Sequence, residues 1–169
     1  QCSVKTPYNV NLLVMGTVKS AGSGCMCPAN TVIRALLHHL LVKRKEAVVT
    51  DMEAGVEHMG RGTAEHVETM LIVTDTNLKS MQTANKRYTL AKQIGIKKTC
   101  LVGNKIRNQQ ETNLIENYAK QNQIPILGMV PFDEKILKAD IQGETPLRYG
   151  NQSIGVAAIH TIGQKLVQA

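Results

Sequence analysis

The chain has 169 residues, of which 43% are hydrophobic, 20% charged and 3% aromatic, with a formal net charge of +7. This composition is typical of one well-cored globular domain and excludes disorder and collagen-like structure. Apolar runs stay well below the ~20 residues of a membrane span, the first residues lack the pattern of a signal peptide, and the few aromatic side chains disfavour single-strand binding by base stacking.

The positive charge is spread along the chain, and its densest run is Lys43, Arg44 and Lys45. The first interpretation of this distribution is an ordinary solvated surface. The second is a site for an anionic ligand such as a nucleotide, and the third is a DNA-binding surface. The cysteines at positions 2, 25, 27 and 100 are too unevenly placed for a secreted disulfide scaffold, which indicates a reduced, cytoplasmic protein.

Short apolar runs alternate with longer helical patterns along the chain. Strands are predicted at residues 9–15, 46–50, 70–74, 99–102 and 125–130, and helices at residues 28–43, 78–94, 111–121 and 154–167. The continuous apolar run at 70–74 is typical of a strand covered on both faces, and the run at 46–50 is typical of a buried strand. The alternation predicts an α/β fold, a single domain over residues 1–169 with a mostly parallel sheet and helices on both faces.

Cys25 and Cys27 are separated by one residue and stand just before a helix that Pro28 opens. The amides and dipole of that helix start favour a thiolate. Two thiolates fill half of a four-coordinate Zn or Ni site, so the other ligands would come from a second copy of the chain. Two ordinary reduced thiols are the alternative.

Asp51 follows the predicted strand 46–50, and Gly55 stands four residues later. In phosphate-binding α/β folds an Asp at this place holds Mg²⁺ and the Gly amide senses the terminal phosphate. A simple turn cap by Asp51 is the alternative.

Asn104 and Lys105 end the predicted strand 99–102 in the run Gly-Asn-Lys. An Asn amide offers both a donor and an acceptor to a purine edge, although Gly and Asn also suit an ordinary turn. The motif Gxxxx-GK[ST], which cradles phosphates, occurs nowhere in the chain.

Three segments together carry a resemblance to a known family: residues 22–28 (GSGCMCP), residues 51–58 (DMEAGVEH) and residues 102–105 (VGNK). The chain resembles the CooC-type accessory ATPases, MinD/ParA-related P-loop proteins that assist nickel insertion into carbon monoxide dehydrogenase. The likeness runs from about Asn9 to the C-terminus and includes residues 126–133 (ILGMVPFD).

The resemblance implies a homodimer that binds ATP or ADP with Mg²⁺ and works with carbon monoxide dehydrogenase. It implies that Cys25 and Cys27 bind Ni²⁺ or Zn²⁺ at the dimer interface. It further implies Mg²⁺ binding near Asp51 and phosphate sensing by Gly55. The residues that it assigns to the adenine are Asn104 with Lys105, and Pro131 with Phe132.

The chain departs from this family at its front, because the first strand and its phosphate loop have no counterpart here. With the non-Met start at Gln1, this predicts the later two-thirds of such a domain, not competent for ATP hydrolysis alone. The alternative is a MinD/ParA-like nucleotide-dependent scaffold or partition protein with no metal role. The lack of a dense basic patch and of a basic amphipathic C-terminal helix disfavours nucleic acid and membrane partners.

Overall fold

The computed structural model describes residues 4–13, 47–51 and 67–168. The chain divides into two compact units, Gln1–Val49 and Thr50–Ala169. The predicted helix at residues 28–43 lies outside the described residues.

A short hairpin is the regular structure described in the first unit. Strand β1 (Val4–Lys5) pairs antiparallel with β2 (Asn11–Leu12). The Thr6 amide donates to the Val10 carbonyl at 2.9 Å, and Asn9 turns the chain with a φ of 59°. The strand predicted at residues 9–15 is confirmed over Asn11–Leu12; residues 9, 10 and 13 are not part of a strand, and residues 14 and 15 lie outside the described residues.

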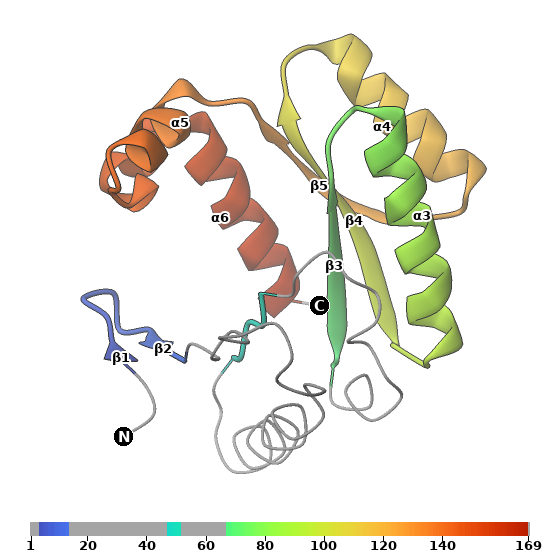
Figure 1. Cartoon of the computed structure of the whole chain (residues 1–169), viewed down its shortest axis with the longest axis horizontal. Coiled ribbons are helices and arrows are strands. Elements are labelled where there is room, and N and C mark those ends of the chain that lie inside the picture. The colour runs from blue at the N-terminus through green and yellow to red at the C-terminus, as the bar shows by residue number, and fades with distance from the viewer. Residues whose placement is uncertain (1–3, 14–46, 52–66, 169) are drawn as a thin grey trace, which may run out of the picture. The chain divides into compact units, whose positions relative to one another are not determined.

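The second unit contains a three-stranded parallel sheet in the order β3-β4-β5 (Figure 1). Its strands are β3 (Thr69–Thr74), β4 (Lys98–Ile106) and β5 (Ile126–Pro131). These strands confirm the predicted α/β class and parallel sheet. Strand β4 extends beyond the predicted end at Val102, because Gly103 and Ile106 still pair with Met129 and Pro131 of β5.

Helices α3 (Leu78–Gln93) and α4 (Gln109–Gln121) connect these strands. Asn77 begins α3 by accepting from the Ser80 amide at 2.8 Å, as a side-chain cap does. Gly95 follows the end of this helix with a φ of +87°, the left-handed conformation in which helices commonly end.

The main core lies between the sheet and the helix pair α3 and α4. Its buried members come from both helices, from the strands and from the α4–β5 turn: Ile72, Met81, Ala84, Tyr88, Leu101, Ile106, Ile115, Ala119 and Ile124. The Tyr88 hydroxyl donates to the Gln123 carbonyl at 3.1 Å, so the one polar atom of this side chain keeps a partner.

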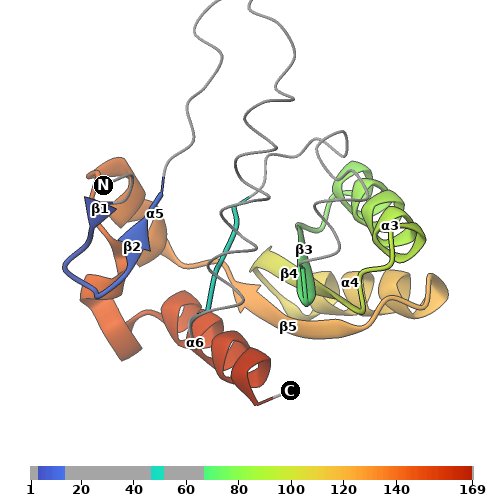
Figure 2. The same ribbon diagram turned by 90° about the horizontal axis from the view of Figure 1, so that it is seen from below.

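Helix α6 (Ile154–Val167) covers the opposite face of the sheet, as Figure 2 shows. Ile162 packs there against Val102 and Val130. Gly128 permits this approach, because a Cβ on it would lie 2.7 Å from Cγ1 of Ile162. Helices on both faces confirm the predicted layering.

Two helical elements escaped the sequence prediction: α5 (Glu134–Ile141) and the 3-10 segment η2 (Pro146–Gln152). Both are shorter than the window in which a helical period is readable, and glycines with positive φ follow or interrupt them at Gly143 and Gly150.

Two predictions for the strands are wrong. Residues 47–50 form no strand, and Val49 is 93% exposed. The apolar side chains of β3 are not covered on both faces, because Ile72 is buried while Leu71 and Val73 are exposed. A strand is stable only when a neighbour pairs with it, and among the described residues β3 pairs with β4 alone.

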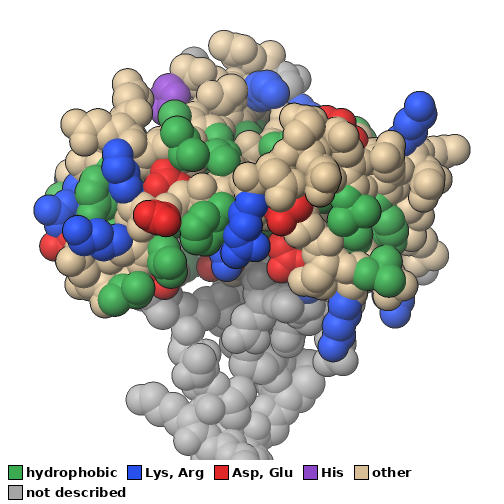
Figure 3. Space-filling model, turned by 90° about the horizontal axis from the view of Figure 1, so that it is seen from above, with side chains coloured by type: hydrophobic (Ala, Val, Ile, Leu, Met, Phe, Trp, Pro, Cys, Tyr) green, Lys and Arg blue, Asp and Glu red, His purple; other side chains and the backbone are tan. Residues whose placement is uncertain are grey.

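The surface in Figure 3 mixes Lys and Arg side chains with acidic and hydrophobic ones, so this face shows no dense basic patch. None of the described helices is long and apolar enough to cross a membrane.

Candidate functional site

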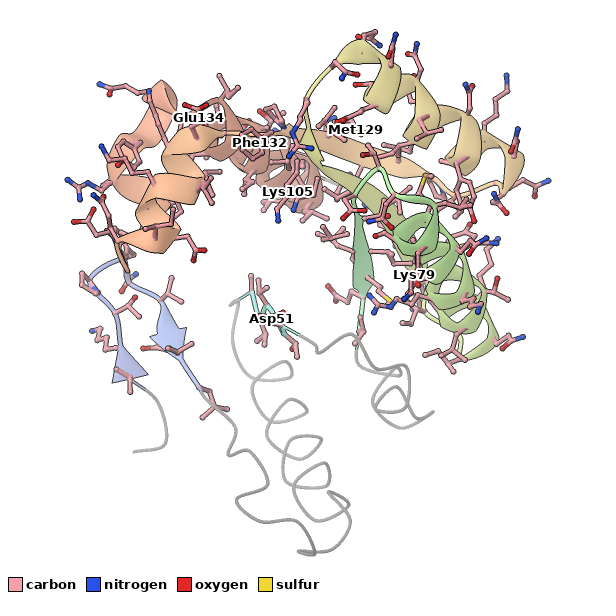
Figure 4. The ribbon with its side chains drawn as sticks, turned by 45° about the horizontal axis from the view of Figure 1, so that its top comes forward. Asp51, Lys79, Lys105, Met129, Phe132 and Glu134 are labelled. Atoms are coloured by element: carbon pink, nitrogen blue, oxygen red, sulfur yellow. The ribbon has the colours of Figure 1, made fainter. Side chains whose placement is uncertain are left out.

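The carboxyl ends of β4 and β5 bring two predicted segments together. Ile106 of β4 is paired with Pro131 of β5. The Phe132 amide then donates to the Ile106 carbonyl at 2.8 Å, which extends the pairing past the end of β5. Figure 4 shows Lys105 and Phe132 at this edge of the sheet. Ligands of open parallel sheets bind at such carboxyl ends, so this corner is the candidate site.

A bulge in β4 sets the direction of Asn104 and Lys105. Between the pairs Gly103–Met129 and Ile106–Pro131, β4 holds two residues where β5 holds one. Lys105 has a φ of 58°, which places a residue other than glycine in the left-handed region. Bulges of this kind re-aim side chains at strand ends. Asn104 is half-buried here and Lys105 is exposed.

Gly103 stands just before this bulge because there is no room for a side chain. A Cβ on it would contact the sulfur of Met129 and lie 3.1 Å from Cδ1 of Ile115. The glycine of the Gly-Asn-Lys run therefore has a packing role besides any role in a turn, because it allows side chains of α4 and β5 to pack closely on β4.

Arg107 is a residue of this corner that the sequence analysis missed. Its guanidinium carbon lies 4.9 Å from the centroid of the Phe132 ring, within the range of a cation–π contact. Its amide donates to Oε2 of Glu111 at 2.7 Å, and Asn108 caps α4 by accepting from the Glu111 amide at 2.9 Å. The sequence pattern of Asn108 followed by Glu111, which is typical of a helix start, could have indicated this residue, because it places Arg107 directly before the helix.

Asp133, the residue after Phe132, forms hydrogen bonds with the starts of α5 and α6. Its carboxylate accepts from the Lys135 amide at 2.8 Å, from the Ser153 hydroxyl at 2.6 Å and from the Gly155 amide at 3.0 Å. These bonds, the one from Ser153 first, hold the pKa of Asp133 below its usual value. One side chain thus joins the starts of α5 and α6 directly after Phe132.

A hollow of about 380 Å³ lies at the carboxyl end of β3 and along the first turns of α3. Its lining includes Asp75, Asn77 and Lys79. Asp75 already accepts from the Asn77 amide at 3.1 Å, so this carboxylate serves the local turn.

Four predicted site residues remain: Asp51, Gly55, Cys25 and Cys27. Asp51 is exposed in an irregular segment, and no described residue bonds to its carboxylate (Figure 4). Gly55, Cys25 and Cys27 lie outside the described residues. Over residues 4–13, 47–51 and 67–168 no group of three His, Cys, Asp or Glu side chains forms a metal site, and the Cys100 thiol is buried.

The chain belongs to the NifH/frxC family, described as 4Fe-4S iron sulfur cluster binding proteins, whose model matches residues 20–168. Within that class it is 46% identical to the carbon monoxide dehydrogenase accessory protein CooC of Rhodospirillum rubrum, over 79% of this chain and 50% of that protein. It is 43% identical to an ATP-binding protein of Methanocaldococcus jannaschii, over 80% of this chain and 53% of that protein. These matches confirm the resemblance to the CooC-type proteins. The chain spans about half the length of these curated relatives.

Solved structures share the fold. The chain superposes on the MinC:MinD cell division complex of Aquifex aeolicus with a TM-score of 0.74 and 17% identity, covering 99% of this chain and 67% of that chain. A ParA family ATPase from Chlorobium tepidum gives a TM-score of 0.70 and 18% identity, over 95% of this chain and 64% of that chain. These likenesses confirm the MinD/ParA-like P-loop NTPase fold.

Proposed function

We propose that this chain is part of an ATP-dependent accessory protein that inserts nickel into carbon monoxide dehydrogenase and works as a homodimer. The observation that carries the proposal is the pairing of the Asn104–Lys105 bulge with the Pro131–Phe132 strand end, in a chain 46% identical to a CooC protein.

In this proposal the corner binds the adenine of ATP. Asn104 offers a donor and an acceptor to the base, and Lys105 stands beside it. Pro131 and Phe132 supply an apolar surface for the ring. Asp51 would hold Mg²⁺ and Gly55 would sense the terminal phosphate.

The metal role rests on Cys25 and Cys27. Two thiolates from each of two protomers make a four-sulfur site, which suits Zn²⁺ or Ni²⁺. The same four sulfurs also suit a [4Fe–4S] cluster, which the family description names. ATP-driven closure of the two subunits would assemble the four-sulfur site, and hydrolysis would release the bound ion to the dehydrogenase.

The metal role is tested with Cys25→Ser and Cys27→Ser, and Cys100→Ala is the matched control. We expect the wild-type chain and Cys100→Ala to bind one Ni²⁺ or Zn²⁺ per dimer, and both serine variants to lose the ion. Unchanged metal stoichiometry in the double serine variant contradicts the metal role. A cluster is distinguished by visible absorption after reconstitution with iron and sulfide.

We expect no ATP hydrolysis by the 169-residue chain alone, because its sequence contains no Gxxxx-GK[ST] phosphate loop. Phosphate release from ATP measures this directly. A turnover rate that Asp51→Asn abolishes would contradict the expectation.

A nucleotide-dependent scaffold or partition protein of the MinD/ParA kind is the second candidate, favoured by the TM-scores of 0.74 and 0.70. Its net charge of +7 would then face DNA or a membrane surface. Retention on DNA that falls steeply with salt would support this candidate. The face of the described residues in Figure 3 carries mixed charges and no dense basic patch.

A further inference from the structure

Helix α3 differs from α4 and α5 in the sign of its charges. Every charged residue from Thr76 to Gln110 is a lysine or an arginine. Those on the helix are Lys79, Lys86, Arg87 and Lys92. The first turn of α3 has no acidic residue, although the helix dipole favours one there, whereas α4 and α5 carry Glu111 and Glu134 in their first turns. The positive charge of α3 is therefore not balanced within the helix.

The outer face of α3 presents part of this charge to solvent. The buried side of the helix consists of Met81, Ala84, Tyr88 and Ala91. Lys79, Gln82 and Lys86 are exposed, and their spacing of three and four positions places them on one face. We call these three residues the basic stripe. Lys79, labelled in Figure 4, stands at its first end.

The lysines of the basic stripe have no acidic neighbour to pair with. Within residues 4–13, 47–51 and 67–168, the side chains of Lys79 and Lys86 make no hydrogen bond or ion pair. Arg148, by contrast, pairs with Glu144 on the same surface segment. A cation in the first turn of a helix is also disfavoured by the helix dipole. A carboxylate supplied by another molecule would improve both interactions, so the stripe complements an acidic surface.

A hollow of about 380 Å³ adjoins the first end of the stripe. Its basic and hydroxyl-bearing lining residues are Lys79, Ser80, Thr83 and Arg87. The carboxylate in this lining, Asp75, accepts from the Asn77 amide at 3.1 Å and so serves the local turn. Leu78, the first residue of α3, is 61% exposed. An apolar side chain and a hollow suit the inserted side chains of a protein partner better than a phosphate backbone.

We propose that the outer face of α3, with the basic stripe, Leu78 and the hollow, docks on an acidic surface of carbon monoxide dehydrogenase, an inference that rests on the proposed function. The lysines attract and orient the acidic surface at long range. Leu78 and the hollow supply the short-range contact. A second copy of this chain does not fit a two-fold contact here, because it would bring the same lysines to face one another.

The test measures binding of the 169-residue chain to immobilised carbon monoxide dehydrogenase from the same organism by surface plasmon resonance. The variant combines Lys79→Glu with Lys86→Glu. We expect its affinity to fall at least about tenfold, mainly through slower association, and to depend less on salt than that of the wild-type chain. Lys79→Glu places a carboxylate where the helix dipole favours it, so the variant should remain folded.

The matched control combines Lys120→Glu with Lys138→Glu. Both lysines are exposed, on α4 and α5, and the control changes the net charge by the same amount as the stripe variant. Its affinity for the dehydrogenase should stay within about twofold of the wild-type value, because exposed charges outside a contact are largely screened by salt. Circular dichroism of each variant confirms that it is folded before its affinity is compared.

The outcomes separate this inference from the proposed function. Unchanged affinity in the stripe variant, or an equal loss in the control, overturns docking through α3 and leaves the dehydrogenase as partner. A wild-type chain that does not bind the dehydrogenase removes both. Retention on DNA or on phosphatidylserine vesicles that the stripe variant loses, with dehydrogenase binding unaltered, assigns the stripe to phosphate groups and also overturns the inference.

Discussion

Replacing Asp133 with alanine should destabilise the second unit strongly, because this one carboxylate serves three donors. The Lys135 amide would lose its cap at the start of α5, which costs about 1 kcal/mol. The Ser153 hydroxyl and Gly155 amide would lose their acceptor as well, and Ser153 is fully buried. A buried donor left without an acceptor costs about 1 to 3 kcal/mol. The losses share one network, so we expect about 3 kcal/mol in total.

The assay is urea unfolding followed by far-ultraviolet circular dichroism, with the free energy of unfolding taken by linear extrapolation. Asp140→Ala is the matched control, since Asp140 is an exposed carboxylate on the same helix α5. It should change the free energy of unfolding by less than about 0.5 kcal/mol. A loss below about 1 kcal/mol in Asp133→Ala, or one equal to that of Asp140→Ala, would refute the reasoning.

Three further predictions follow from the same contacts. The pKa of Asp133 is lowered in the folded chain, so the wild-type chain should exceed Asp133→Asn in free energy of unfolding at neutral pH, and this difference should decline as pH falls below about 4. Urea unfolding across pH measures the difference, and a difference that does not depend on pH contradicts the prediction. Gly128→Ala should cost about 1 to 3 kcal/mol, because its Cβ would lie 2.7 Å from Cγ1 of Ile162. The control Gly163→Ala has no atom within 4 Å of its Cβ and should stabilise α6 by about 0.5 to 1 kcal/mol, so equal melting temperatures for the two variants would contradict the packing. Tyr88→Phe should cost about 0.5 to 1.5 kcal/mol in the same unfolding assay through loss of the bond to Gln123, and no loss would show that water replaces this bond.

Long periodic segments were predictable because their pattern is local. The predicted helix 154–167 coincides with α6, and Leu78–Gln93 differs from the prediction by one residue at its end. The end of α3 was readable from Gly95, whose φ of +87° suits glycine. The short helix α5 was not readable, because eight residues contain too few turns to display a period.

The candidate corner was predictable in part. Asn104, Lys105, Pro131 and Phe132 were chosen from sequence, and the register of β4 and β5 does place the two segments side by side. Their role in binding a nucleotide stays a prediction. Arg107 was not found, because its position beside Phe132 depends on a residue of another strand.

The amino-acid sequence by itself determined the order of the strands β3, β4 and β5 and of the longer helices α3, α4 and α6, since their patterns depend on neighbours within a few positions. Only the tertiary structure decided which strand ends adjoin, where β4 bulges and what Asp133 binds. It also decided that residues 47–50 form no strand and that one face of β3 is exposed. The physical reason is that strand pairing and burial depend on partners distant in the chain, and an apolar run cannot specify whether its partner is present.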